Sequence, residues 1–257
     1  EGSLGVNSWY GKVQTGIMNA EELDRALEFA RTLSRQSGMP ITTALISDVP
    51  GFTWGTVSAL VQSGVRYFAS APNPFDRIGS VLQQWGDHPF YWQSQSGKQE
   101  VLTWVAGLSY ASFHEGSLPK LGEDKIVVIL TKLEASGYPY RIVHLPYTLG
   151  DNAGIDTALS DFVKNWNDVY RSPRLVIATY DRLFKDFEKE YGKTLPHFGG
   201  DFTPYWEDGT ISTAAETAVN RHAADRLAEA EAIWSMVSPR TFPSEEFSDA
   251  WRNVVLY

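Results

Sequence analysis

Two carboxylates follow segments that are typical of buried strands. Asp48 closes the run that begins with ITTALI at 41–46, and Asp151 comes soon after the run RIVHLPY at 141–147. In parallel α/β proteins, functional groups gather on the loops after the carboxyl ends of the strands. If the two strands are parallel neighbours, both carboxylates approach one cavity. Such a pair is the minimum set for glycoside hydrolysis, in which one attacks or stabilises the anomeric carbon and the other protonates the leaving oxygen.

Other polar side chains stand at comparable positions. They are Asn73, Asp76 and Arg77 after 65–70, His114 and Glu115 after 100–107, and Asn152 beside Asp151. Thr179 and Asp181 follow the run RLVIAT, where a helix cap is the simpler interpretation. A strand-end carboxylate is more often a cap or turn former than a catalytic group, so position alone makes Asp48 a candidate only.

The histidines form no recognisable metal motif. They are His88, His114, His144, His197 and His222. None stands in the H-x-H, H-x-x-x-H or H-x-x-E-H spacing that brings several ligands together, so no self-contained zinc site is expected. His144 is interpreted as a core residue with satisfied hydrogen bonds, and His222 as a surface residue. The sequence also lacks G-x-G-x-x-G, P-loop and G-x-S-x-G motifs, which argues against nucleotide binding and serine hydrolysis.

Composition narrows the class of protein. The 257 residues suffice for one large domain or two small ones, and no apolar run has the length of a membrane span. A net charge of -9 argues against nucleic acid or an anionic membrane as partner. Cysteine is absent, which excludes disulfides but leaves the compartment open. The nine Trp, twelve Tyr and thirteen Phe indicate a large core, with some rings free to line a sugar cleft.

Strand and helix patterns alternate along most of the chain. Asn19 and Glu22 form a capping-box pair at the start of a helix that Gly38 and Pro40 end. Strands are predicted at 41–46, 65–70, 100–107, 141–147 and 174–179, and helices at 54–62, 123–137, 159–170 and 180–192. This alternation with apolar strands indicates an α/β barrel or an open, mainly parallel sheet.

The chain changes in character after Asp201. A long Ala- and Glu-rich helix is predicted over 213–237, and Ser244 is placed as the cap of another. The last residues, AWRNVVLY, are interpreted as a strand. Because that run has no polar tail and the first residue is not Met, we expect sequence to be missing at both ends.

Four blocks of sequence resemble glycoside hydrolase family 38, the α-mannosidase family, in its divergent bacterial-type branch. They are SDVPGFTWGTVSALVQSGVRYFA, PYTLGDNAGID, RLVIATYDRLFKDFEKEYGKTLP and GGDFTPYWEDG. Their order agrees with the family's catalytic domain, so the resemblance covers about residues 40–237. It implies a seven-stranded α/β barrel, incomplete here, over 1–209 and the start of a helical domain over 210–257. It also implies a retaining, zinc-assisted enzyme acting on mannosides or related oligosaccharides.

Carried over by motif, the resemblance assigns roles to individual residues. Asp48 would be the nucleophile and a zinc ligand, and Arg77 an active-site arginine. In the acid loop, the family's Gly-x-Asp or Gly-Asp-Asp becomes Gly150-Asp151-Asn152. Strict register would put Asn152 in the place of the acid, whereas a shift of one residue gives Asp151, which we choose.

The sequence departs from the family at the metal. Nothing before Asp48 resembles the family's opening H-x-H-x-D, and no histidine follows the helical region, so the other zinc ligands are expected outside this chain. We therefore expect the 257 residues alone to bind zinc poorly and to be inactive.

Aromatic residues near these blocks receive two interpretations. Phe52, Trp54, Tyr205 and Trp206, together with His114 and Asn152, are candidates for sugar contact, with packing as the alternative for the aromatic rings. Phe90, Tyr91, Trp92, Trp234 and Trp251 are assigned to the core.

Two other functions stay open. A non-catalytic carbohydrate-binding relative would keep the sugar site without the acid. A metal-dependent polysaccharide deacetylase would need an adjacent Asp pair with H-x-x-x-H, and the sequence shows neither.

Overall fold

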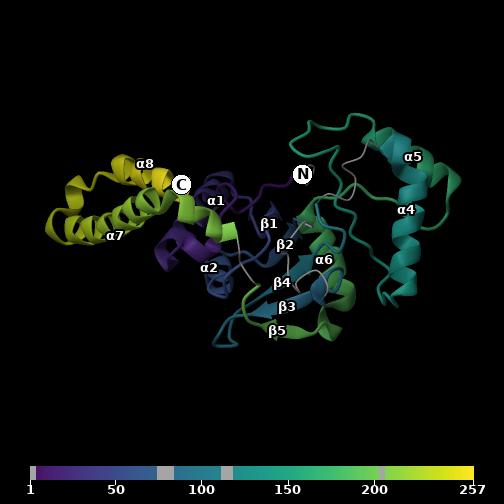
Figure 1. Ribbon diagram of the computed structural model, residues 1–257, viewed down its shortest axis with the longest axis horizontal. Coiled ribbons are helices and arrows are strands. Elements are labelled where there is room, and N and C mark those ends of the chain that lie inside the picture. Colours follow the sequence, from purple (N-terminus) through teal and green to yellow (C-terminus); the bar gives the residue numbers. More distant parts are fainter. Residues whose placement is uncertain (1–3, 74–83, 111–117, 203–205) are drawn as a thin grey trace.

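A five-stranded sheet forms the centre of the molecule, which we describe from a computed structural model over residues 4–73, 84–110, 118–202 and 206–257 (Figure 1). The strands are β1 (Thr43–Asp48), β2 (Tyr67–Pro72), β3 (Phe90–Gln93), β4 (Glu100–Val105) and β5 (His197–Gly199), in the order β1-β2-β4-β3-β5. β1, β2 and β4 run parallel, and β3 pairs antiparallel with β4 and parallel with β5. Asp48 lies opposite Pro72, and Ser70 opposite Val105, so three carboxyl ends meet at one edge.

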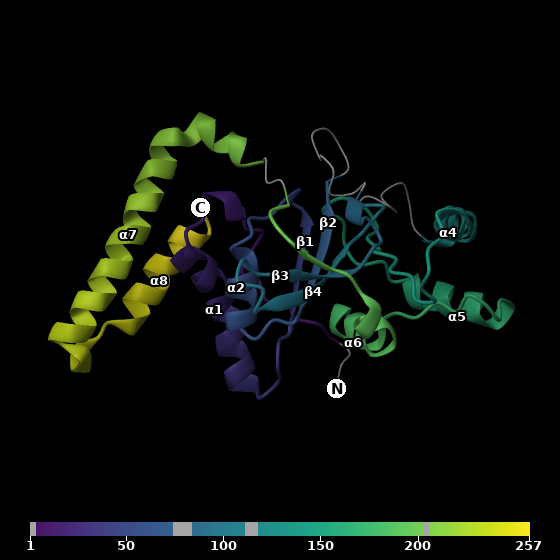
Figure 2. The same ribbon diagram turned by 90° about the horizontal axis from the view of Figure 1, so that it is seen from below.

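Helices cover both faces of the sheet, and others extend away from it. The helices of the described residues are α1 (Ala20–Ser37), α2 (Thr56–Gln62), α4 (Leu118–Ala135), α5 (Leu159–Val169), α6 (Tyr180–Tyr191), α7 (Ala214–Val237) and α8 (Ser244–Val255). Alternation along β2 divides the core, since Phe68 packs in the cluster with α1 and α2, whereas Tyr67 packs with Phe184 and Phe187 of α6. Figure 2 shows α1 and α2 on one side of the strands and α6 on the other. The predicted strand 41–46, helix 54–62 and strand 65–70 are confirmed as the βαβ unit β1-α2-β2, whose strands are parallel.

The predicted helices are confirmed with small shifts at their ends. Asn19 and Glu22 form the expected capping box, and Gly38 ends α1 in the left-handed region with φ 67°. Thr179 caps α6 by accepting a hydrogen bond from the Arg182 amide, as the cap interpretation predicted.

Three strand predictions are wrong. Residues 141–147 and 174–179 belong to no strand or helix, and AWRNVVLY lies mostly within α8. β-Branched residues favour strands only where a partner strand is available, and Val176 and Ile177 remain exposed here. In α8, Phe247, Trp251 and Val254 recur at helical spacing and are buried together.

β3 and β5 were not anticipated, because runs of four and three residues are too short to show a period. The described residues therefore form an α/β fold with a mixed sheet of five strands, and a closed seven-stranded barrel is not confirmed.

Two pairs of helices project from the central part in opposite directions (Figure 1). One consists of α4 and α5, which share a small core of their own with Ile126, Ile129 and Trp166. The other consists of α7 and α8 and packs on α1, as Figures 1 and 2 both show. No described helix has the length and hydropathy needed to cross a membrane.

Candidate active site

Asp48 is the last residue of β1, and its carboxylate is surrounded by donors from three other segments. Asn73 Nδ2 donates to Oδ1 at 2.8 Å, and the Tyr110 hydroxyl also hydrogen-bonds to this carboxylate. Lys12 Nζ lies 3.9 Å from Oδ2. The Asp48 side chain keeps 22% of its surface exposed, so it is fixed in orientation and still open to a ligand.

The Tyr110 hydroxyl is influenced by both predicted carboxylates, Asp48 and Asp151. Burial, the hydrogen bond to Asp48 and the charges of Asp48 and Asp151 raise the pKa of the Tyr110 hydroxyl to about 12. Both carboxylates therefore lie within electrostatic range of this one hydroxyl. Asp151 itself is exposed, in the turn that also contains Asn152.

Three of the unusual backbone conformations lie at the same edge of the sheet. The non-glycine residues with positive φ in the described ranges are Asp48 (76°), Asp87 (57°), Ser109 (64°) and Asn152 (50°). Asp48 ends β1, Ser109 follows β4, and the amide of Asp87 donates to Val105 O at the end of β4. Such conformations cost free energy and persist at positions that the surrounding structure over-determines, often functional sites. Their location supports this edge as the site.

The PGF turn after Asp48 pairs directly with the GGDF segment. Phe52 and Phe202 exchange both backbone hydrogen bonds at 2.9 Å, and Asp201 Oδ1 accepts from the Trp54 amide at 2.6 Å. Two sequence blocks far apart in the chain thus hold the loop beside Asp48. The Phe52 ring is only 1% exposed, so its interpretation as a sugar contact is corrected to a core role.

The structure describes some of the other residues that were predicted to contact sugar. Trp54 is half-buried; its indole N–H donates to Gln93 O at 2.6 Å, which fastens the start of α2 to β3. Trp206 is half-buried at the start of the 3-10 turn Trp206–Thr213. Arg77, His114 and Tyr205 lie outside the described residues.

Asp87 is a buried carboxyl that the sequence did not single out. It accepts hydrogen bonds from the Gly107 amide and from Trp104 Nε1, and burial raises its pKa. A Cβ at Gly107 would lie 2.4 Å from Asp87 Oδ2, so glycine is required for this approach. The contact holds the turn between β4 and Tyr110 in place.

Sequence reasoning also missed Lys12 and Tyr110. Tyr110 follows a predicted strand end, and the rule that selected the other polar residues would have found it had tyrosine been included. Lys12 lies in an irregular segment before α1 and carries no local signal. Only the folded chain brings it to Asp48.

The donor set around Asp48 does not match a zinc site. Zinc in proteins takes His nitrogen, Cys sulfur or carboxylate oxygen, whereas the neighbours of Asp48 named above are an ammonium, an amide N–H and a hydroxyl. Within residues 4–73, 84–110, 118–202 and 206–257, no three His, Asp or Glu side chains gather closely enough to hold a metal ion.

Comparisons with known proteins found one family model and one solved structure that match this chain. Residues 17–208 match the model of the glycosyl hydrolases family 38 N-terminal domain. An α-mannosidase from Enterococcus faecalis V583 has a similar fold, with a TM-score of 0.70 and 14% identity. That similarity covers 98% of this chain and 29% of the Enterococcus chain, so the chain spans less than a third of its structural relative. No curated protein matches.

Proposed function

Because residues 17–208 match the N-terminal domain of glycosyl hydrolase family 38, the chain belongs to this family, and we propose that it contains the nucleophile of a retaining, α-mannosidase-like active site. Asp48 would attack the anomeric carbon of an α-mannoside or related glycoside, breaking the bond to the leaving oxygen and forming a glycosyl ester. Asp151 would give its proton to that oxygen, and would then take one from the water that cleaves the ester.

The observation that carries the proposal is the environment of Asp48. An attacking carboxylate must be ionised and correctly oriented. Asn73 and Tyr110 donate hydrogen bonds to it, which fix its orientation, and Lys12 places a positive charge 3.9 Å from its Oδ2. Asp151, in an exposed turn, is a second carboxylate whose charge acts on the Tyr110 hydroxyl.

The described residues do not fit zinc, and no step here depends on a metal. When bound in such enzymes, a zinc ion polarises oxygen ligands as a Lewis acid. Asp48 is the residue of this chain that we propose would contact it, with other ligands from outside the described residues.

One observation keeps a second function in view. Asn152 occupies a left-handed turn position next to Asp151, and its amide cannot donate an acidic proton. If Asn152 stands in the place of the acid, the protein would bind carbohydrate without cleaving it.

Kinetics of the Asp48→Asn variant test the proposal in the full-length protein that carries this chain. With an aryl α-mannoside as substrate, we expect kcat/KM to fall at least about 1000-fold, because the amide cannot form the glycosyl ester. Asp161→Asn, an exposed position on α5, is the matched control and should retain wild-type turnover. Turnover of the mannoside that survives Asp48→Asn would contradict the catalytic proposal.

A further inference from the structure

Asp151 lies in a surface loop whose two ends are joined by a hydrogen bond. The loop comprises residues 148–155, and we call it the Asp151 loop. The hydroxyl of Tyr147, directly before the loop, donates to Oδ2 of Asp156, directly after it. Because this contact closes the loop at its base, fewer conformations are open to the Asp151 loop than to a free segment of the same length.

Both ends of the Asp151 loop are anchored to the pair of helices α4 and α5. The half-buried Tyr147 ring packs against the small core of this pair around Trp166, and Leu159, the first residue of α5, packs against the same core. Asp156 is also tied to the start of α5, since its Oδ1 accepts from the Ala158 amide at 2.9 Å. Each carboxylate oxygen of Asp156 therefore has a donor, which fixes the orientation of this side chain at the base of the loop.

The loop carries its carboxylate within electrostatic range of the candidate active site. Asp151 is exposed, and its charge acts on the Tyr110 hydroxyl, which hydrogen-bonds to Asp48. A general acid must come within hydrogen-bond distance of the leaving oxygen, and a displacement of about 1 Å can lower the rate about 100-fold. Because an exposed side chain is not fixed by packing, the position of the Asp151 carboxyl depends on how the backbone of the loop is held.

We propose that Tyr147 and Asp156 are positioning residues for the general acid Asp151. Their hydrogen bond holds the Asp151 loop in the conformation that presents the Asp151 carboxyl to the leaving oxygen. The two residues act through the backbone of the loop and do not touch the substrate. The role of Asp151 as the acid rests on the proposed function, whereas the closure of the loop does not.

Two tyrosine variants of the full-length protein that carries this chain test the proposal. Tyr147→Phe removes the hydrogen bond and keeps the ring. Tyr170→Phe is the matched control, because the Tyr170 hydroxyl also donates to a carboxylate, that of Glu123, on the same pair of helices but outside the loop. We would measure kcat/KM with 2,4-dinitrophenyl α-mannoside, whose leaving group departs as a stable anion, and with 4-methoxyphenyl α-mannoside, whose leaving oxygen needs a proton.

The two substrates separate an effect on the acid from a general loss of structure. We expect Tyr147→Phe to lower kcat/KM about tenfold for the methoxyphenyl mannoside and less than about twofold for the dinitrophenyl mannoside, because only the first depends on the acid. Tyr170→Phe should leave both values unchanged. A partly unfolded protein would lose activity equally on both substrates. Equal losses for the two mannosides, or no loss for either, would overturn the positioning role.

Digestion with thermolysin reports on the loop without requiring activity. Thermolysin cleaves before apolar residues, and Ile155 in the Asp151 loop is 92% exposed. We expect Tyr147→Phe to be cut before Ile155 several-fold faster than the wild type and Tyr170→Phe, with the site identified by mass spectrometry. If the wild type hydrolyses neither mannoside, the proposed function fails, and digestion alone decides whether Tyr147 and Asp156 close the loop. Equal cleavage rates in the three proteins would overturn that closure.

Discussion

His144 is a titratable side chain that the proposed chemistry does not use. Its ring lies edge-on to Trp104 and Tyr180, with centroids 5.5 and 5.1 Å away. Its Nδ1 atom is shielded from solvent and has no partner in the described part of the chain. The side chain is half-buried, so the interpretation as a core residue is confirmed only in part, and the expected satisfaction of its hydrogen bonds is wrong for Nδ1. Burial lowers the pKa of the imidazole to about 4 from its ordinary 6.5.

Stability should consequently depend on pH through His144. Between pH 6.5 and about 4 the unfolded chain binds a proton that the folded chain does not, so folding stability is lost as pH falls through this window. His144→Leu removes the group, and we expect its Tm to decline less than the wild-type Tm as pH falls from 7 to 4.5. His222→Leu, at an exposed position of α7, should keep the wild-type dependence. Parallel Tm curves for wild type and His144→Leu would contradict the assignment.

The sequence predicted where Asp48 lies in the fold, but not which side chains surround its carboxylate. Asp48 and Asn73 follow strands of one βαβ unit, so their meeting at one edge could be anticipated. The approach of Lys12 could not, because it depends on how an irregular segment is anchored. The contact of Tyr110 depends likewise on a turn held by Asp87.

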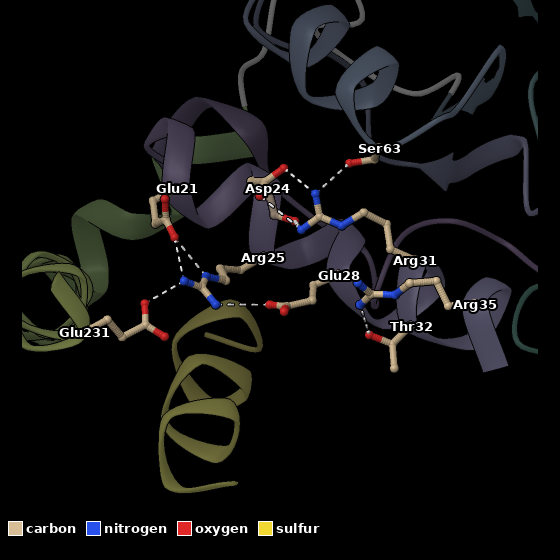
Figure 3. A network of polar contacts seen from close by, with 9 residues as sticks. All are labelled: Glu21, Asp24, Arg25, Glu28, Arg31, Thr32, Arg35, Ser63 and Glu231. Atoms are coloured by element: carbon tan, nitrogen blue, oxygen red, sulfur yellow. Dashed lines mark hydrogen bonds and ion pairs between the residues drawn. The ribbon is translucent and has the colours of Figure 1, made fainter. Parts of the chain in front are cut away.

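Arg25 of α1 links the α7–α8 hairpin to the central part of the molecule (Figure 3). From α1 it contacts Glu21 at 2.8 Å, Glu28 at 3.1 Å and, across to α7, Glu231 at 2.5 Å. Its guanidinium also lies 4.8 Å from the ring centroid of Trp251 in α8. One cation thus connects three helices, and both Arg25 and Glu231 are largely shielded from solvent.

Replacing Arg25 should loosen the docking of the α7–α8 hairpin. In Arg25→Met the aliphatic part of the side chain stays, but Glu231 loses its partner and Trp251 its cation. We expect a loss of about 2 kcal/mol in the free energy of unfolding, or about 5 °C in Tm. Arg226→Met is the control, since the ion pair of Arg226 within the described residues is an exposed one with Glu229 on the same helix. Equal Tm values for the two variants in thermal unfolding would show that this network does not hold the hairpin.

The same two helices explain one confirmed and one wrong prediction. Trp251, predicted to be core, is 3% exposed because α8 turns that face toward α1 and α7. Trp234 was assigned to the core on the same spacing and is 41% exposed. It lies near the free end of the hairpin, where its indole donates to Thr241 O. The helical period predicts which face of a helix is buried, but not how much of its length a neighbouring helix covers.

For the whole molecule, the helices were predicted well because caps and period are local signals. The strands were predicted less well because strand pairing is not local. Residues 141–147 have the composition of a strand but form no strand pairing with the described residues, and β5 forms from three residues. Membership of the family was accessible from blocks that the fold brings into contact, the PGF turn and the GGDF segment.

Metal content is a property of the whole chain, because a zinc site needs ligands from several elements at one point. Asp48 is the proposed ligand, and donors and an ammonium surround it. We therefore expect the purified 257-residue chain to retain far less than one zinc per molecule after dialysis, measured by inductively coupled plasma mass spectrometry. A single carboxylate beside a lysine cannot replace the hydration shell of the ion. Asp48→Asn, treated identically, sets the background of adventitious zinc. Stoichiometric zinc in the wild type that Asp48→Asn loses would show that this chain assembles the metal site from its own residues.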